Sequence, residues 1–570
     1  MKLFLIDAIG PFFRGYERKK INWSKIPFTH LPTAGPARDT QFAQIREDLD
    51  VFAGRVKALG VNAVTLDDVV HLTDHPFYEA PVREQIAVYS AEFRRIFDLL
   101  ADHGLQIYLT MDVYSSTPGL QKRLGNDKRR INAFLQDLVA RCLDQYPQLA
   151  GIIFRVGESD GLDVKGLFRS QLYIKTPAML NRFIHDMLPL FESRGRTLIL
   201  RTWTVGAHSV GDLIWHRDTL ASALEGIDSE AFILSMKHGE SDFFRYLPVN
   251  KNFFRTPVQK IVELQSKREY EGCGEFPAFI GLEHEHIARE LAGAPGMVGM
   301  CIWCQTGGWV PFRRLAFIGQ GSLWTEINTA VTLALFRDGL SLEEAVCRVA
   351  EERPASAMLE FLRLSEEVVC ELYYHKEFAE QKLFFRRVRV PPLIGVYWNT
   401  IFVNHSLKKL LRYYTSEPEA ELSAASAALE KIRRMEVLAE RLDLPVADVV
   451  FMRHTFAILA LARSYFYQPY DESIRERLRK AKKQYKKTYP KTLRPRYAVR
   501  LDFTPFRLRG RFLRWSLALL LRRRRGYRLI DQIFTIHLLS YLFRLISRAS
   551  PRVVPKFARK SAMGVETLFR

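Results

Sequence analysis

The sequence predicts an α/β fold, a (β/α)8 TIM barrel followed by an all-α C-terminal region. Short apolar runs alternate with longer amphipathic stretches over residues 1–310, which is typical of parallel strands joined by helices. Eight such runs favour a closed barrel over an open doubly wound sheet. Beyond residue 308 the apolar residues recur at helical spacing, so the second part of the chain is predicted to be helical.

Each predicted strand is a short apolar run, and several polar residues begin where these runs end. The strands are predicted at residues 3–8, 63–66, 106–111, 151–156, 197–202, 231–236, 261–264 and 297–303. Long helices are predicted between them at residues 40–59, 83–103, 129–146 and 176–193. No glycine-rich phosphate loop follows any of these strands, which disfavours a nucleotide-dependent enzyme.

The second part of the chain carries its own helix signals. Ser341 and Glu344 have the Ser-x-x-Glu spacing of a capping box, and residues 421–442 form another helical pattern. The segment 373–414 is rich in both aromatic and basic residues, which either line a groove or, more commonly, pack a helical core. We therefore divide the chain into a barrel (1–310), a helical domain (311–470) and a basic helical tail (471–570).

Composition and charge narrow the class of protein. A chain of 570 residues that is 48% hydrophobic can bury a large core, and its six scattered cysteines favour a reducing, cytoplasmic compartment over a disulfide framework. The net charge is +21, and residues 471–570 contain 28 Lys and Arg against 6 Asp and Glu, which leaves −1 for the rest. An excess confined to one terminal segment indicates an appendage with its own partner.

The basic tail predicts contact with an anionic membrane surface. Over residues 511–522 the three arginines lie on one helical arc and the leucines on the other, with Trp515 near the boundary, and the arginine run 522–525 follows directly. The more apolar run 527–548 is interrupted by charged residues, which argues against a spanning helix. The alternatives are an acidic polysaccharide or glycolipid, nucleic acid bound through residues 482–491, or a solvated helical subdomain. Nucleic acid is the least favoured partner, and a homodimer is left open.

Charged side chains collect where the fourth to seventh strands end. They are Arg155, Glu158, Asp160, Arg201, Lys237, Asp242 and Glu269. Because the carboxyl ends of parallel strands meet on one face of a barrel, we expect these groups to share a rim. Carboxylates supply general acid and base, and cations hold a substrate carboxylate, so the set fits a glycosidase acting on an acidic sugar. The alternative is that these charges pair with one another, as barrel rims are commonly charged.

Four segments resemble the α-glucuronidases of glycoside hydrolase family 67. Residues 263–272, Glu-Leu-Gln-Ser-Lys-Arg-Glu-Tyr-Glu-Gly, match in register that family's Glu-Phe-Gln-x-x-Gln-Glu-Tyr-x-Gly. Residues 237–243, with Pro-Val at 248–249, are similar to its Lys-Asn-Gly-Pro-Ile-Asp-Phe and downstream Pro-Val, and residues 200–203 to its Phe-Arg-Thr-Phe. Residues 151–158 are similar to the strand that bears its catalytic acid. The resemblance covers residues 150–345.

The resemblance implies an inverting hydrolase that removes an α-linked uronic or other carboxylated sugar. It implies Glu158 as general acid and Asp242 and Glu269 as bases that flank the water, with either as the main base. An inverting enzyme needs about 6.5–9.5 Å between acid and base. Asp160 is the second candidate for the acid, because the family's Lys-Ala-Asp-Ser-Glu is one residue longer than the corresponding segment here.

The resemblance also implies a set of substrate-binding residues: Arg155, Arg201, Lys237, Trp203 and Tyr270. The three cations would bind the sugar carboxylate, and the substrate would be an acidic oligosaccharide or glycoconjugate. No cofactor and no metal site is predicted. The alternative function is a non-catalytic carbohydrate-binding or scaffold protein of surface-glycan metabolism, which the basic tail recruits to the inner face of a membrane.

Overall fold

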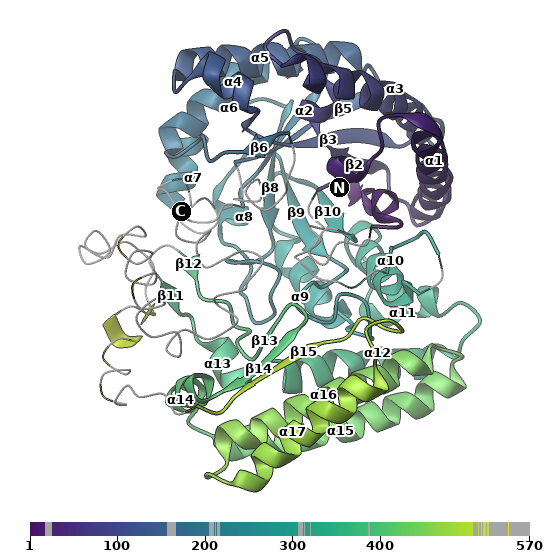
Figure 1. Ribbon diagram of the computed structural model, residues 1–570, viewed down its shortest axis with the longest axis vertical. Helices are drawn as coiled ribbons and strands as arrows, with labels where there is room; N and C mark the ends of the chain where they lie inside the picture. Colours follow the sequence, from purple (N-terminus) through teal and green to yellow (C-terminus); the bar gives the residue numbers. More distant parts are fainter. Residues whose placement is uncertain are drawn as a thin grey trace.

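The computed structural model confirms the eight-stranded parallel barrel (Figure 1). It describes residues 1–16, 25–156, 167–203, 210, 213, 217–305, 312, 314–319, 321–385, 388–504, 511, 515, 517–519, 521–523, 538 and 545. All eight predicted strands are present, within two residues of the expected ends. They are β1 (Leu3–Asp7), β2 (Ala63–Asp67), β3 (Gln106–Asp112), β5 (Leu149–Arg155), β7 (Thr197–Arg201), β8 (Phe232–Lys237), β9 (Lys260–Gln265) and β10 (Met297–Trp303).

The strands close in the order β1-β10-β9-β8-β7-β5-β3-β2. Alternate residues of each strand face inward and outward, and both faces are buried, as parallel sheets require. In β1, for example, Leu3 and Leu5 belong to the inner core, whereas Phe4 and Ile6 pack under the surrounding helices. Because both faces of each strand are buried, the strands appear in the sequence as nearly continuous apolar runs. The last residue of each strand therefore lies at the carboxyl-end rim.

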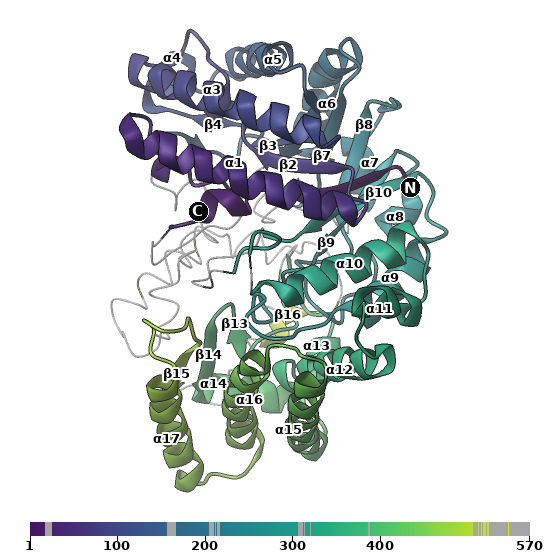
Figure 2. The same cartoon turned by 90° about the vertical axis from the view of Figure 1, so that its right-hand side faces the viewer.

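Helices surround the barrel, as the amphipathic stretches predicted (Figure 2). They are α1 (Gly35–Ala58), α2 (Val69–Leu72), α3 (Ala80–Asp102), α4 (Pro118–Leu124), α5 (Lys128–Gln145), α6 (Pro177–Glu192), α7 (Arg217–Ala223), α8 (Asn252–Arg255), α9 (Gly281–Leu291) and α10 (Leu323–Arg337). Capping side chains and prolines in the first turn determine where several of these helices begin, as α6 shows. The Thr176 hydroxyl accepts a hydrogen bond from the Met179 N–H, and Pro177 occupies the first turn, where no N–H partner is needed.

The C-terminal region is mainly helical and lies below the barrel in Figures 1 and 2. Its helices are α11 (Leu342–Ala350), α12 (Ala355–Val368), a π-helix (Val369–Tyr373), α13 (Lys376–Glu380), α14 (His405–Tyr414), α15 (Pro418–Arg441), α16 (Val446–Tyr467) and α17 (Glu472–Thr488). The capping box predicted at Ser341 and Glu344 is confirmed, since both reciprocal hydrogen bonds are present.

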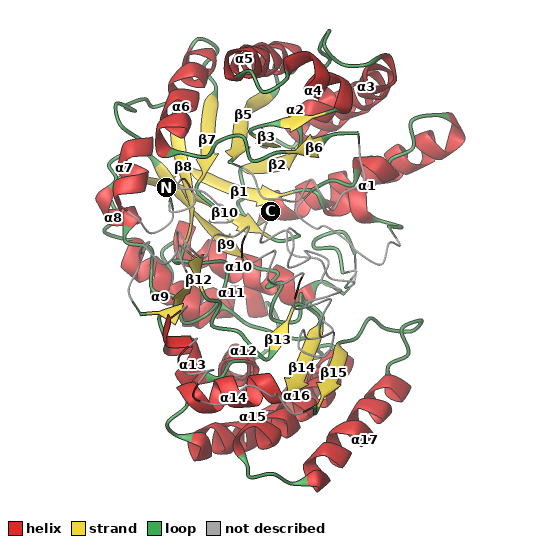
Figure 3. Ribbon diagram, turned by 60° about the vertical axis from the view of Figure 1, so that its left-hand side comes forward, coloured by secondary structure: helices red, strands yellow, loops and turns green. Residues whose placement is uncertain are grey.

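Two small sheets interrupt this helical region, which the sequence pattern did not predict. One is β12 (Val388–Arg389), β11 (Phe384–Phe385) and β16 (Leu521–Arg522), and the other is β13 (Val396–Tyr397), β14 (Thr400–Asn404) and β15 (Ala498–Asp502). The second sheet lies between the barrel and α15–α17 (Figure 3). Most of these strands are two residues long, too short for a period-2 pattern to register.

The first part of the basic tail packs onto the helical region. Ile474, Leu478 and Tyr485 bury one face of α17, which lies against α16, and β15 pairs with β14 in parallel. Most of the segments 511–525 and 527–548 lie outside the described residues. Among the helices that the structure does describe, none is long and apolar enough to cross a membrane.

Candidate functional site

The strand ends bring several of the predicted residues to one rim. Arg155, Arg201 and Lys237 are the last residues of β5, β7 and β8, and Arg155 stands directly beside Arg201 in the strand register. Asp242 and Glu269 lie in the loops that follow β8 and β9. The rim expected from the sequence therefore exists, but its charged groups fall into separate clusters.

The first cluster, which we call the Lys237 cluster, comprises Lys237, Asp242, Tyr270 and Trp203. Lys237 Nζ lies 2.5 Å from Asp242 Oδ1, and the Tyr270 hydroxyl donates to Asp242 Oδ2 at 2.9 Å. Lys237 Nζ also lies 3.7 Å from the centroid of the Trp203 ring, a cation–π contact. All four residues were predicted from the sequence, and the structure brings them together.

The Lys237 cluster keeps Asp242 ionised. Burial opposes the charged form of Asp242, but the Lys237 ammonium and the hydrogen bonds from Tyr270 and the Phe243 N–H lower its pKa below the ordinary value. The carboxylate is also held in one orientation, because both of its oxygens accept hydrogen bonds. An ionised, fixed carboxylate is the form that a general base requires.

Glu269 is held by a residue of the C-terminal region. It is 7% exposed, and Trp398 Nε1 donates to its Oε2 at 3.0 Å. Trp398 lies in the turn between β13 and β14 and has a positive φ of 48°, which is unusual for a bulky residue. Burial and the charges of Glu269 and Asp242 raise the pKa of the neighbouring Tyr397.

Aromatic side chains from two parts of the chain meet beside these carboxylates. The Tyr270 ring stacks on Phe244 at 4.4 Å and lies nearly parallel to Trp398, with centroids 6.4 Å apart and an angle of 8°. Tyr397 is 5.8 Å from Tyr270 and 4.6 Å from Trp398. We call Phe244, Tyr270, Tyr397 and Trp398 the aromatic wall. Tyr397 and Trp398 were missed as site residues; the aromatic enrichment of the segment 373–414 was the signal that pointed to them.

Arg201 belongs to a separate, fully buried ion pair. Its Nε and Nη2 donate to Glu263 Oε1 and Oε2 at 2.9 and 2.7 Å, and its guanidinium stacks on Trp303 at 4.5 Å. Ser235 Oγ and Trp303 Nε1 also donate to Glu263. Burial opposes ionisation of Glu263, but Arg201 lowers its pKa. This edge of the Arg201 guanidinium is therefore occupied by a carboxylate of the protein.

Arg155 lies in a third cluster, inside the barrel mouth. Its Nε is 2.9 Å from Asp112 Oδ1 and its Nη2 is 3.9 Å from Asp67 Oδ1, while Lys25 also bonds to Asp112. Burial raises the pKa of Asp67 to about 7, although the charge of Arg155 opposes this shift. The signal for these partners was present in the sequence, because Asp67 and Asp112 end β2 and β3.

The interior end of the barrel between these clusters is closely packed. A cavity of about 10 Å³ lies there, lined by Asp7, Ile9, Thr65, Leu66, Asp67, Thr110, Arg155, Arg201 and Trp303. This volume has room for about one water molecule. A sugar ring therefore cannot enter between Arg155 and Arg201 in this conformation, whereas the Lys237 cluster and the aromatic wall lie in the loops above. The predicted acid Glu158 and its alternative Asp160 lie outside the described residues.

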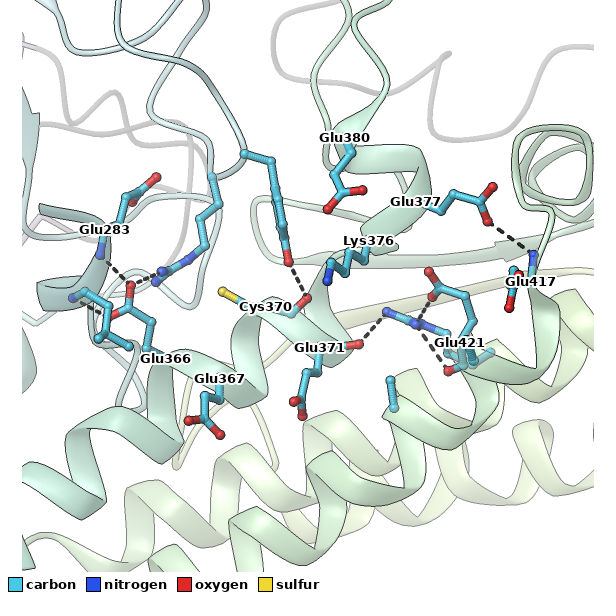
Figure 4. Close-up of a pocket in the computed structure, with 16 residues that line it drawn as sticks. Glu283, Glu366, Glu367, Cys370, Glu371, Lys376, Glu377, Glu380, Glu417 and Glu421 are labelled. Atoms are coloured by element: carbon cyan, nitrogen blue, oxygen red, sulfur yellow. Dashed lines mark hydrogen bonds and ion pairs between the residues drawn. The ribbon is translucent and has the colours of Figure 1, made fainter. Parts of the chain in front are cut away.

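A much larger cavity, of about 720 Å³, lies between the barrel loops and the C-terminal region (Figure 4). Eight glutamates line it, against three cations. One of these cations, Arg245, forms buried ion pairs with Glu271 at 2.9 Å and Glu366 at 2.6 Å. None of the predicted site residues contributes to this cavity. Its acidic lining would repel a uronate, so it does not compete with the rim as an acidic-sugar site.

Comparison with known proteins defines the class of the fold. No family model matches the sequence, and no curated protein sequence matches it. Among solved structures, the chain is similar to a GH138 enzyme targeting pectin rhamnogalacturonan II, with a TM-score of 0.51 and 12% identity over 82% of this chain and 57% of that one. The chain thus spans less than two thirds of that enzyme's length.

Other solved structures match the chain with lower TM-scores. A family 89 glycoside hydrolase from Clostridium perfringens matches with a TM-score of 0.43, 11% identity and coverage of 82% of this chain and 52% of that one. An O-GlcNAc hydrolase from Thermobaculum terrenum matches with a TM-score of 0.38, 10% identity and coverage of 79% and 88%. The fold of this chain, a (β/α)8 barrel followed by a helical region, is similar to that of the GH138 enzyme. Membership of family 67 stays a prediction.

Proposed function

We propose that the protein is an inverting glycoside hydrolase that removes an α-linked uronic acid or another carboxylated sugar. The observation that carries this proposal is the Lys237 cluster beside Glu269 and the aromatic wall. It combines an ionised carboxylate, a second buried carboxylate, a cation and aromatic faces at the carboxyl-end rim of the barrel. Active sites of TIM-barrel enzymes lie on this face.

The proposed mechanism uses Asp242 or Glu269 as the base. The base removes a proton from a water molecule as that water attacks the anomeric carbon from the face opposite the leaving group. Asp242 is supported by its fixed orientation, because both of its oxygens accept hydrogen bonds. Glu269 accepts a hydrogen bond from the Trp398 indole N–H and would orient the water or replace Asp242 as the base.

The general acid is proposed to be Glu158, with Asp160 as the alternative. Both follow β5 in the sequence, and β7 separates β5 from β8 in the barrel, so either is proposed to protonate the leaving oxygen while the base acts on the far face. The sugar itself is proposed to pack on Trp203 and Tyr270. Aromatic faces bind the apolar C–H face of a pyranose ring without competing for its hydroxyl groups.

The sugar carboxylate is proposed to bind the cations of the rim. Lys237 is supported by its place in the Lys237 cluster, beside Trp203 and Asp242. Arg201 and Arg155 remain proposals for the same role, although each already faces a carboxylate of the protein.

The experiment that tests this function compares acidic and neutral substrates on the full chain. We expect hydrolysis of 4-nitrophenyl α-D-glucuronide or α-D-galacturonide and none of 4-nitrophenyl α-D-glucoside. Asp242→Asn should lower kcat by roughly 10²–10⁴-fold, which is the range for loss of a general base. Asp50→Asn, on the outer surface of α1 with 64% of its side chain exposed, is the matched control. Equal turnover of acidic and neutral glycosides would contradict the proposal.

A non-catalytic carbohydrate-binding or scaffold role is the second candidate. The observation that favours it is the closely packed barrel interior, where Arg155 and Arg201 are paired with carboxylates and the cavity holds about 10 Å³. A binder would retain affinity for an acidic oligosaccharide, show no turnover, and be unaffected by Glu158→Gln. Calorimetric titration together with the hydrolysis assay separates the two functions.

We also propose that the basic tail contacts an anionic membrane surface. This is supported by the exposed cations of α17, which are Arg477, Arg479, Lys480, Lys483, Lys486 and Lys487. Each adds about 1 kcal/mol near an anionic bilayer. Full-length protein should sediment with vesicles containing phosphatidylglycerol and not with pure phosphatidylcholine, and Lys483→Glu with Lys486→Glu should weaken this binding. Tighter binding to a random RNA duplex than to the vesicles would contradict it.

A further inference from the structure

One flank of α17 carries a row of cations beside a cavity. Arg475, Arg479 and Lys482 are spaced by four and three residues, which places them on one side of the helix, next to the face that Ile474 and Leu478 bury. We call these three cations the α17 row. The cavity lies between α17 and the end of β15 (Figure 2) and has a volume of about 470 Å³. It is lined by Arg479, Lys482, Leu501, Asp502, Phe503 and Thr504.

The α17 row is accessible and only partly neutralised. Arg475 and Arg479 share one carboxylate, Glu472, at 3.0 and 3.2 Å. The side chain of Arg479 is 56% exposed, so a ligand in the cavity can reach its guanidinium. Lys482 has no ion-pair partner among the residues that the structure describes. The cavity lining contains one carboxylate, Asp502, whose Oδ1 accepts a hydrogen bond from a backbone N–H of the following turn.

A second helix, α14, brings a further cation to the same place. Lys408 Nζ lies 4.9 Å from the centroid of the Tyr465 ring, and that ring lies 5.2 Å from Phe503, which lines the cavity. The guanidinium carbons of Arg475 and Arg479 each lie 5.4 Å from the centroid of Phe503. Cations from α14 and α17 therefore surround one pair of aromatic rings.

These cations repel one another. Burial lowers the pKa of Lys408, and the charges of Arg412 on α14 and Arg475 on α17 lower it further. Burial and two neighbouring cations likewise lower the pKa of Lys482. The positive charges are therefore close together and incompletely compensated. An anion bound in the cavity would relieve this repulsion, so the electrostatics of the region favour an anionic ligand.

The chain that follows β15 offers little negative charge to this place. Residues 505–570 contain 16 Lys and Arg against 2 Asp and Glu. We therefore expect the compensating anion to come from another molecule. Phosphate suits the α17 row, because arginine and lysine donate several charge-assisted hydrogen bonds that phosphate oxygens accept. A phosphate monoester has three free oxygens, whereas a diester has two.

We propose that the cavity between α17 and β15 binds a phosphate monoester through Arg479 and Lys482, with Arg475 and Lys408 adding to the positive field. The group can belong to a lipid headgroup or to a soluble compound, because both present the same oxygens. This binding function is separate from glycoside hydrolysis. The lipid source rests on the proposed membrane contact, whereas the site itself does not.

The first arm of the test is cosedimentation of the full chain with two kinds of phosphatidylcholine vesicle. One contains phosphatidic acid, a monoester, and the other contains phosphatidylglycerol, a diester, at the same zeta potential. Diffuse attraction to the surface predicts equal binding, because it depends on the surface potential alone. The proposed site predicts that the wild type binds the phosphatidic acid vesicles roughly tenfold more tightly, the effect of one additional charge-assisted hydrogen bond.

Two double variants separate the site from the net charge of α17. Arg479→Gln with Lys482→Gln removes the two cations that line the cavity, and it should bind both kinds of vesicle about equally. Arg477→Gln with Lys480→Gln removes two exposed cations from another side of the same helix. This matched control should bind both kinds of vesicle more weakly but keep the preference for phosphatidic acid.

The second arm is thermal unfolding in sodium phosphate against sodium chloride at equal ionic strength. Phosphate should raise the Tm of the wild type more than that of Arg479→Gln with Lys482→Gln, since general stabilisation by phosphate acts on both proteins alike. This difference without a lipid preference would assign the site to a soluble phosphate compound, even if the membrane contact fails. A lipid preference that the variant loses would assign it to a headgroup. Equal binding to both vesicles together with equal Tm shifts would overturn the site.

Discussion

The two sides of the barrel mouth neutralise their charges in different ways. On the β5–β7 side, Arg155 and Arg201 are paired with Asp112 and Glu263 beneath a cavity that holds about one water. On the β8–β9 side, Lys237 is paired with Asp242, and aromatic rings from the C-terminal region contact Glu269 and Tyr270 in the loop after β9. Charge at a strand end is therefore not by itself evidence of a ligand. What distinguishes a binding group is how its partners are arranged around it.

The largest loss of stability should come from breaking the buried ion pair between Arg201 and Glu263 on the β5–β7 side. Glu263→Gln removes the charge that compensates buried Arg201, and we expect about 3–5 kcal/mol of lost stability in urea unfolding. The double variant Arg201→Met with Glu263→Gln removes both charges but keeps an acceptor for Ser235 and Trp303, and it should recover most of this loss. If Glu263→Gln were as stable as the wild type, the ion pair would not be the stabilising element that we infer.

The second largest effect is a dependence of folding stability on pH, caused by the titration of Asp67. Its folded pKa of about 7 is higher than the ordinary value of an aspartate, so the folded state retains a proton that the unfolded state loses. The wild type should therefore lose stability relative to Asp67→Asn as the pH rises from about 4 to 7, by roughly 2–4 kcal/mol. Paired urea titrations at pH 4.5 and 8 measure this difference. A constant difference between the two proteins would show that Asp67 titrates normally.

On the loop side, Trp398→Phe tests the contribution of the C-terminal region. The substitution keeps a ring in the aromatic wall but removes the N–H that donates to Glu269. A hydrogen bond to a charged group contributes about 1.5–3 kcal/mol, so kcat should fall at least roughly tenfold, with a smaller change in KM. Tyr397→Phe is the neighbouring control and should retain activity. Equal kinetics for both variants would remove Trp398 from the site.

The smallest effect is expected from Tyr270→Phe. Loss of the hydroxyl removes one of three interactions that lower the pKa of Asp242, so this pKa should rise toward its ordinary value. Because the base must be ionised, the acidic limb of the kcat/KM profile should move to higher pH. Lys237 and the Phe243 N–H retain most of the effect. A shift to lower pH would contradict the role of Asp242 as the base.

The sequence was sufficient for the barrel but not for the site. Apolar runs with polar residues at their ends located all eight strands, because strands buried on both faces leave a clear local pattern. The Lys237 cluster followed from its motifs, since Lys237 and Asp242 are close in the chain. Pairs such as Arg201 with Glu263 join residues 62 positions apart and leave no local signal.

The contribution of the C-terminal region was also beyond local pattern. Trp398 and Arg389 contact Glu269 and Glu240, which lie in barrel loops more than a hundred residues earlier in the chain. Both contacts come from a segment whose strands are two to five residues long. Aromatic and basic enrichment marked the segment 373–414, but enrichment does not say what a segment faces. Contacts of this kind depend on tertiary packing, which local sequence patterns do not reveal.

The most direct test of the central claim is the anomeric form of the first product. Proton NMR during hydrolysis of 4-nitrophenyl α-D-glucuronide or galacturonide should show the β-anomer of the free uronic acid first, because an inverting mechanism reverses the configuration. Asp242→Asn should form that anomer at a strongly reduced rate. Initial release of the α-anomer, or an undiminished rate in Asp242→Asn, would contradict the account.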